Sequence, residues 1–262
     1  MNSFKGLVQK EWLVGKTTLL WLLALQAGFV CLAFFAASYW EVAGLFYLCT
    51  WLNMLVQPLF IFSVILSCLH SEGKTMLWIH NPQSAAMLLG SKLSISMFFQ
   101  VASIFFSACI VFGGMMIPES LFKKGFHNET MLDGGSLLMT AGVLVMVSLA
   151  LAVFTLFLWI VYHALAGNDV MKPLRVLLIS AFCLGMLFFR NWLVSTGLYM
   201  KLDELWTVPI ISDSSFSMSL DHFEFSFQTG GSLSLLTSGF ELIGLVILFL
   251  ISCWLLDRKI EV

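Results

Sequence analysis

Two short Gly-Lys-Thr runs, Gly15 to Thr17 and Gly73 to Thr75, resemble the end of a phosphate-binding loop. A P-loop needs a further glycine five residues before the glycine of this run, a strand before the loop and a helix after it. Lys10 and Cys68 stand at those earlier positions, and the segments before both runs have helical patterns. We therefore expect that the chain does not bind a nucleotide itself.

The histidines and cysteines form no pattern that predicts a metal site or a nucleophile. The sequence has no HExxH, no CxxC and no GxSxG. The five histidines are scattered along the chain: His70, His80, His127, His163 and His222. The six cysteines fall inside apolar runs, where small core residues are expected: Cys31, Cys49, Cys68, Cys109, Cys183 and Cys253. We expect neither an enzyme nor a cofactor in this chain.

The composition is that of an integral membrane protein. Of the 262 residues 60% are hydrophobic and 11% are charged, with a mean hydropathy of +0.95. A soluble domain carries about 25% charged residues, so this chain has too few to cover a surface in water. Its apolar runs are continuous and longer than the ~10-residue alternating strands of a membrane barrel. This predicts an all-α integral membrane protein with a single domain over residues 1–262.

Six apolar runs are long enough to cross a bilayer, which takes about 20 residues in a helix. They cover residues 17–37, 45–69, 93–117, 136–163, 174–198 and 232–256. Residues 1–16 have an apolar face that Glu11 interrupts, which predicts an amphipathic interfacial helix with Trp12 at the headgroups. The first run is too long for the apolar part of a signal peptide, so we expect an uncleaved span.

Polar groups inside these runs have two interpretations. Pro58 removes a backbone donor and is expected to kink its helix, and nearby amides can satisfy the freed carbonyl. Three amides, Asn53, Gln57 and Gln100, either pack in this way or line a path for a substrate.

Two charges lie inside the last two runs, at similar depths below their outer ends. Each charge alone would cost about 2.5–3.5 kcal/mol at the centre of a membrane helix. We therefore expect Arg190 and Glu241 to pair inside the bundle. The alternative is that Arg190 reaches outward to the headgroups and Glu241 is protonated and hydrogen-bonded by itself.

The polar interval from Tyr199 to Gly231 predicts a small β-hairpin. Apolar residues alternate with serine or glutamate over residues 216–220 and again over residues 223–227. This repeat of two is typical of strands, and the turn-type residues Asp221 and His222 separate the two runs.

The distribution of lysine and arginine predicts the orientation, because cytoplasmic loops carry the excess. Nine lie on the side of the N-terminus: Lys5, Lys10, Lys16, Lys74, Lys92, Lys172, Arg175, Arg258 and Lys259. Three lie on the other side: Lys123, Lys124 and Lys201. Both termini and residues 70–92 are then cytoplasmic, and the hairpin is outside the cell.

The polar interval from His70 to Lys92 has the pattern of a short helix across the end of a membrane bundle. Residues 76–80 form a compact amphipathic turn, and the residue before Pro82 is expected to end it. Ser84 can cap the helix that follows. A transporter without an ATP site can still be driven by a separate ATPase, and docking of that ATPase needs a short, anchored cytoplasmic element of this kind.

At this point the chain resembles the permeases of the ABC-2 class of ABC transporters. It shares with them a Lys-Glu-aromatic step at Lys10 to Trp12 in an interfacial helix, six spans with both ends inside, a coupling helix between spans two and three, and a polar outer segment between spans five and six. The coupling pattern of the family is matched in order by Glu72, Gly73, Thr75, Leu77, Pro82 and Lys92. Lys74 departs from its commonest form.

The resemblance implies the transmembrane subunit of an ATP-driven exporter of an amphipathic peptide, antibiotic, lipid or glycolipid. It implies contact with the ATPase through Glu72, Gly73, Thr75, Leu77, Trp78, Pro82 and Gln83. The implied partners are cytoplasmic ABC ATPase subunits, which bind the ATP, a second permease chain, identical or not, and the lipid bilayer, but no nucleic acid. The alternative is a sensor, scaffold or immunity-type protein of the same fold that binds a ligand without transporting it.

Overall fold

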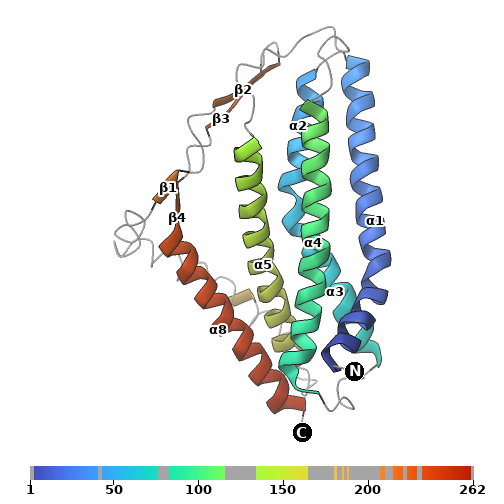
Figure 1. Cartoon of the computed structure of the whole chain (residues 1–262), viewed down its shortest axis with the longest axis vertical. Helices are drawn as coiled ribbons and strands as arrows, with labels where there is room; N and C mark the ends of the chain where they lie inside the picture. Colours follow the sequence, from blue (N-terminus) through green and yellow to red (C-terminus); the bar gives the residue numbers. More distant parts are fainter. Residues whose placement is uncertain are drawn as a thin grey trace. The chain divides into compact units, whose positions relative to one another are not determined.

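A computed structural model describes most of the helical part of the chain (Figure 1). The described residues are 3–40, 43–75, 83–115, 134–164, 180, 181, 185, 188, 207–209, 215–220, 223–228 and 232–260. Their six helices are α1 (Ser3–Trp40), α2 (Ala43–Leu55), α3 (Gln57–Thr75), α4 (Ala85–Met115), α5 (Gly134–Ala164) and α8 (Leu235–Ile260). The prediction of an all-α membrane protein is confirmed at this level.

The chain divides into two compact units. The first contains Met1–Ser71, Ser91–Ala152 and Ile211–Gly230, and the second contains Glu72–Gly90, Val153–Ile210 and Gly231–Val262. The divisions within α4 and α5 fall inside continuous helices, so each of these helices contributes to both units.

Four helices of the described part of the chain are long and apolar enough to cross a membrane singly. They are Phe4–Trp40, Ala85–Gly114, Leu137–Ala164 and Gly239–Arg258. Helices α2 and α3 form a fifth candidate if their bent pair counts as one span. These candidates include five of the six predicted runs. The run predicted at 174–198 lies almost wholly outside the described residues.

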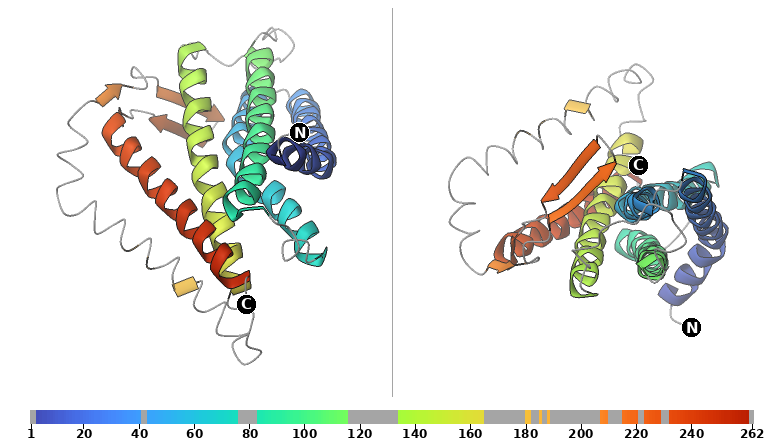
Figure 2. Two further views of the ribbon diagram at one scale, coloured as in Figure 1. Left: turned by 60° about the horizontal axis from the view of Figure 1, so that its bottom comes forward. Right: turned by 90° about the horizontal axis from the view of Figure 1, so that it is seen from above.

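Helix α1 is continuous, whereas the sequence predicts a separate interfacial helix at 1–16. Its 38 residues rise about 57 Å, while the hydrocarbon core of a bilayer is about 30 Å thick. The helix must therefore tilt in the bilayer, or its ends must extend beyond the hydrocarbon. The N-terminal turns, dark blue in Figure 2, are inclined to the rest of α1. The interfacial location of these turns stays a prediction.

The kink predicted at Pro58 is confirmed. Helix α2 ends at Leu55, α3 begins at Gln57, and the two are bent by 42°. Pro58 stands in the first turn of α3, where a helix has no internal partner for its N–H groups. Two backbone hydrogen bonds of 3.0 Å lie at the break, from Val56 N to Leu52 O and from Leu59 N to Val56 O.

Helix α3 reaches further into the polar interval than the predicted span, which ends at 69, because it continues to Thr75. Helix α4 begins at Ala85, before the span predicted from 93. Charged residues end the part of a helix that suits hydrocarbon, but they do not end the helix. Ser84 directly precedes α4, as predicted, and its carbonyl accepts bonds from Met87 N and Leu88 N at 3.0 and 3.2 Å.

The predicted hairpin is confirmed in the backbone. Strand β2 (Ser215–Leu220) pairs antiparallel with β3 (Phe223–Gln228), and the register sets Phe216 opposite Phe227. A second antiparallel pair, which the sequence analysis missed, joins β1 (Thr207–Pro209) to β4 (Ser232–Ser234) immediately before α8.

A close contact between α1 and α4 depends on Gly15. A Cβ atom at this position would overlap the ring of Phe99, which is 1% exposed. The ring of Trp12 also lies against Phe99, with 5.2 Å between the centroids. A tightly packed core does not accommodate an extra methyl group without a shift of its neighbours.

We expect Gly15→Ala to lower the free energy of unfolding by about 1–3 kcal/mol, because overpacking a core costs this much. Gly28→Ala in the same helix is the matched control, since apart from its chain neighbours and its own helix backbone no atom lies within 4 Å of its Cβ position. There the better helix propensity of alanine should leave stability equal or raise it by about 0.5–1 kcal/mol. Thermal unfolding in detergent measures both variants, and equal stability of the two would contradict the close contact.

Candidate functional site

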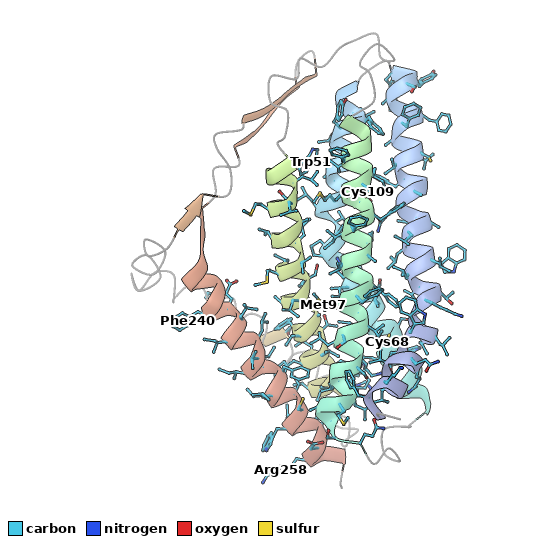
Figure 3. The ribbon with its side chains drawn as sticks, in the orientation of Figure 1. Trp51, Cys68, Met97, Cys109, Phe240 and Arg258 are labelled. Atoms are coloured by element: carbon cyan, nitrogen blue, oxygen red, sulfur yellow. The ribbon has the colours of Figure 1, made fainter. Side chains whose placement is uncertain are left out.

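One face of α4 carries a row of buried polar side chains. Lys92, Ser96, Gln100, Ser103 and Ser107 are each at most 2% exposed. Steps of four, four, three and four residues keep them on one side of a helix, and the row rises about 22 Å. Met97 and Cys109 mark the course of this part of α4 in Figure 3. We call the row and its partners on α1, α2 and α3 the polar seam.

An ion pair lies at the N-terminal end of the polar seam. Lys92 Nζ is 2.7 Å from Glu11 Oε1, and the two side chains are 0% and 2% exposed. The bond joins α1 to α4. Two buried charges attract each other strongly, but removing either one leaves the other uncompensated. The pair therefore fixes the N-terminal part of α1 against the start of α4.

A triangle of neutral side chains lies further along the polar seam. Gln26 Nε2 donates to Ser103 Oγ at 2.6 Å, and Ser103 Oγ donates to Gln57 Oε1 at 2.7 Å. A longer bond of 3.4 Å from Gln26 Nε2 to Gln57 Oε1 closes the triangle. These bonds connect α1, α3 and α4 at one level.

Amide side chains also satisfy the backbone beside the break between α2 and α3. Gln100 Nε2 donates to the carbonyl of Gln57 at 2.7 Å, and Gln57 Nε2 donates to the carbonyl of Asn53 at 3.3 Å. Asn53 Nδ2 in turn donates to Ser107 Oγ at 3.1 Å. A bent helix inside a membrane needs such internal partners, because hydrocarbon provides none.

The three amides predicted from the sequence therefore meet in one network. Asn53, Gln57 and Gln100 are 6%, 0% and 1% exposed. Their burial and their mutual bonds favour the packing role within this chain. Their alternative role in lining a path for a substrate stays a prediction.

In the second unit, the start of α4 is bound by α8. Ala85 N donates to Asp257 Oδ1 at 3.1 Å. A carboxylate that accepts from a first-turn N–H stabilises a helix, because these groups have no partner within the helix and carry a partial positive charge. One turn of α8 also holds Arg258 over the ring of Trp254, with Cζ 5.0 Å from the centroid.

The predicted ATPase-coupling residues lie partly within the described chain. Glu72, Gly73 and Thr75 are in the last turns of α3, and Gln83 is half-buried just before α4. The other three, Leu77, Trp78 and Pro82, lie outside the described residues. The coupling role stays a prediction.

The predicted pair of Arg190 and Glu241 is also untested. Glu241 is at an exposed position of α8, and Arg190 lies outside the described residues. Among the residues that were described, no group of three or more His, Cys, Asp or Glu could hold a metal ion.

Sequence reasoning missed Gln26, Ser103 and Ser107, and it did not pair Glu11 with Lys92. A signal was present, because the helical spacing of polar residues along 92–107 is visible in the sequence. Gln26 likewise follows Glu11 by about four turns, on the same face of α1. Such spacing gives the face of a helix but does not name the helix that packs on it.

The chain is similar to the uncharacterized protein YhcE of Bacillus subtilis (strain 168). The two are 27% identical over 278 residues, which cover 100% of each chain. No family model matches the chain, and no solved structure matches it. By the length and hydropathy of its helices, the chain is a multi-pass helical membrane protein.

We expect Glu11→Gln or Lys92→Met to lower the free energy of unfolding by about 3–5 kcal/mol, because each substitution removes one charge and leaves the other buried without its partner. The double variant Glu11→Gln/Lys92→Met should lose less than the sum of the two. The control is Lys16→Met, because Lys16 is exposed and such a change usually alters stability by at most about 0.5 kcal/mol. Additive losses in the double variant, measured by unfolding in bicelles, would show that the two side chains act independently.

Proposed function

We propose that this chain is the transmembrane subunit of an ATP-driven ABC-2 type transporter that exports an amphipathic substrate. Separate cytoplasmic ATPase subunits bind the ATP and dock on residues 70–92. The observation that supports this proposal most is that other helices hold the first turns of α4. Asp257 binds the first residue of α4, and Glu11 binds Lys92 two turns later.

This fixation suits a coupling element. A docked ATPase can move a membrane helix only if the contact is firmly attached to that helix, because a loose loop would absorb the movement. Helix α4 begins three residues after Pro82 and continues without a break to Met115. A force at residues 76–82 would thus act on α4 and, through the Glu11–Lys92 pair, on α1.

The same two contacts support the predicted sidedness. Glu11 is near the beginning of α1 and Asp257 is near the end of α8, and each binds α4 within two turns of Ala85. Within each unit, one contact thus sets a helix end beside the start of α4: the beginning of α1 in the first unit and the end of α8 in the second. The excess of lysine and arginine on the side where α4 begins indicates the cytoplasm.

Large apolar side chains provide the surface for lipid and for a second permease chain. On α1 the most exposed of them are Leu20, Trp21, Leu32, Phe35 and Tyr39, at 65–83%.

Transport in proteoliposomes with the ATPase present separates the exporter from the alternative, a sensor or scaffold that binds the ligand without moving it.

In the assembled transporter, Leu77→Asp and Trp78→Ala should each reduce substrate-stimulated ATP hydrolysis at least about tenfold, because truncating a central interface residue typically costs roughly 2 kcal/mol or more. Insertion and the yield of the purified chain should not change. The matched control is Leu121→Asp, which makes the same change in the predicted outer loop. Normal coupled hydrolysis in both coupling variants would refute the docking assignment.

The orientation is tested with single cysteines in a chain whose native cysteines are replaced by alanine. In intact cells, cysteines at Asn128 and Ser214 should react with an impermeant thiol reagent. A cysteine at Gln83 should react only after the membrane is permeabilised. The reverse pattern of labelling would overturn the orientation that the lysine and arginine distribution predicts.

A further inference from the structure

Three oxygen atoms in the middle of the polar seam have no hydrogen-bond partner among the residues that the structure describes. They are Ser96 Oγ, Gln100 Oε1 and Gln26 Oε1, and their side chains are 0%, 1% and 0% exposed. Ser96 and Gln100 are one turn apart on α4. Ser103, three residues beyond Gln100, binds Gln26, so the three oxygens belong to consecutive levels of one seam.

The side-chain amides of Gln26 and Gln100 cannot be turned over so that Nε2 takes the place of the unpaired Oε1. Gln26 Nε2 faces Gln57 Oε1, and Gln100 Nε2 faces the carbonyl oxygen of Gln57. A flip of either amide would set two acceptor oxygens against each other. Both Oε1 atoms are therefore acceptors.

A buried acceptor without a donor lowers the stability of a protein inside a membrane. Leaving a buried polar group unsatisfied costs about 1–3 kcal/mol, and the hydrocarbon of a bilayer offers no compensation. Three such atoms in one seam thus favour a ligand that donates hydrogen bonds. A metal cation is disfavoured, because the carboxylate of the described seam, that of Glu11, is already bound to Lys92.

We propose that the middle of the polar seam is an internal hydration site, in which ordered water molecules donate to Ser96, Gln100 and Gln26. Water is neutral, small and able to make about three hydrogen bonds in a buried site. Bonds through water can change partners, so α4 can shift against α1 without exposing bare polar atoms to hydrocarbon. The site is independent of the proposed transport function.

Silver ion, a small hydrophilic reagent for thiols, tests the proposal on the full chain in bilayers. The native cysteines are replaced by alanine, and Ser96→Cys is compared with Ser148→Cys. Ser148 is 0% exposed, but its Oγ donates to Leu144 O within its own helix at 2.7 Å. The thiol at 96 should react at least about tenfold faster, because the reactive thiolate forms readily only where water can solvate its charge.

Adding Gln100→Leu to Ser96→Cys should slow the reaction at 96, because leucine removes the neighbouring acceptor. Equal rates at 96 and 148, or a fast reaction at 96 that Gln100→Leu leaves unchanged, would overturn the proposal. Solid-state NMR of the unmodified chain gives an independent measurement. The side-chain amides of Gln26 and Gln100 should receive magnetisation from water, and the absence of transfer to both would also overturn it.

Discussion

The arrangement of this protein depends on one constraint: a polar group inside a bilayer must find its partner within the protein. Helix α4 meets this constraint along about 22 Å of its length. Its buried polar face binds α1 through Glu11 and Gln26, and it binds the bent pair α2–α3 through Asn53 and Gln57. Apolar packing is less selective, because side chains that face lipid and side chains that face another helix are equally apolar.

The same constraint connects the structure to the proposed function. Helix α4 begins within the stretch proposed to receive the ATPase, residues 70–92, and its first turns carry two polar contacts, with Asp257 and with Glu11. Neutral bonds occupy the remainder of the polar seam. A start that is held by charged groups and a middle that is held by neutral hydrogen bonds suit the helix movement that the proposed function requires.

The sequence predicted the features that depend on local properties. Residue types within a few positions determine each of these features: the apolar runs, the break at Pro58, the start of a helix after Ser84 and the hairpin around Asp221 and His222. The ion pair between α1 and α4 was not predicted. Glu11 and Lys92 were both noted as motif residues, but they are 81 residues apart, and spacing within one helix does not identify the partner helix.

The continuity of α1 was missed for a related reason. The polar residues near its N-terminus suggested a separate helix, but Glu11 is neutralised by Lys92 and Gly15 packs against Phe99. These contacts let the helix continue through a segment whose amphipathic pattern alone indicates an interfacial location. Tertiary contacts thus overrode a local pattern.

A double-mutant cycle between Gln26 and Ser103 tests most directly whether the polar seam holds the helices together. The variants are Gln26→Met, Ser103→Ala and the double variant, with the free energy of unfolding measured in bicelles. We expect a favourable coupling energy of about 0.6 kcal/mol, the average for side-chain hydrogen bonds between membrane helices, and at most about 1.7 kcal/mol. Additive effects, with a coupling energy of zero within error, would contradict it.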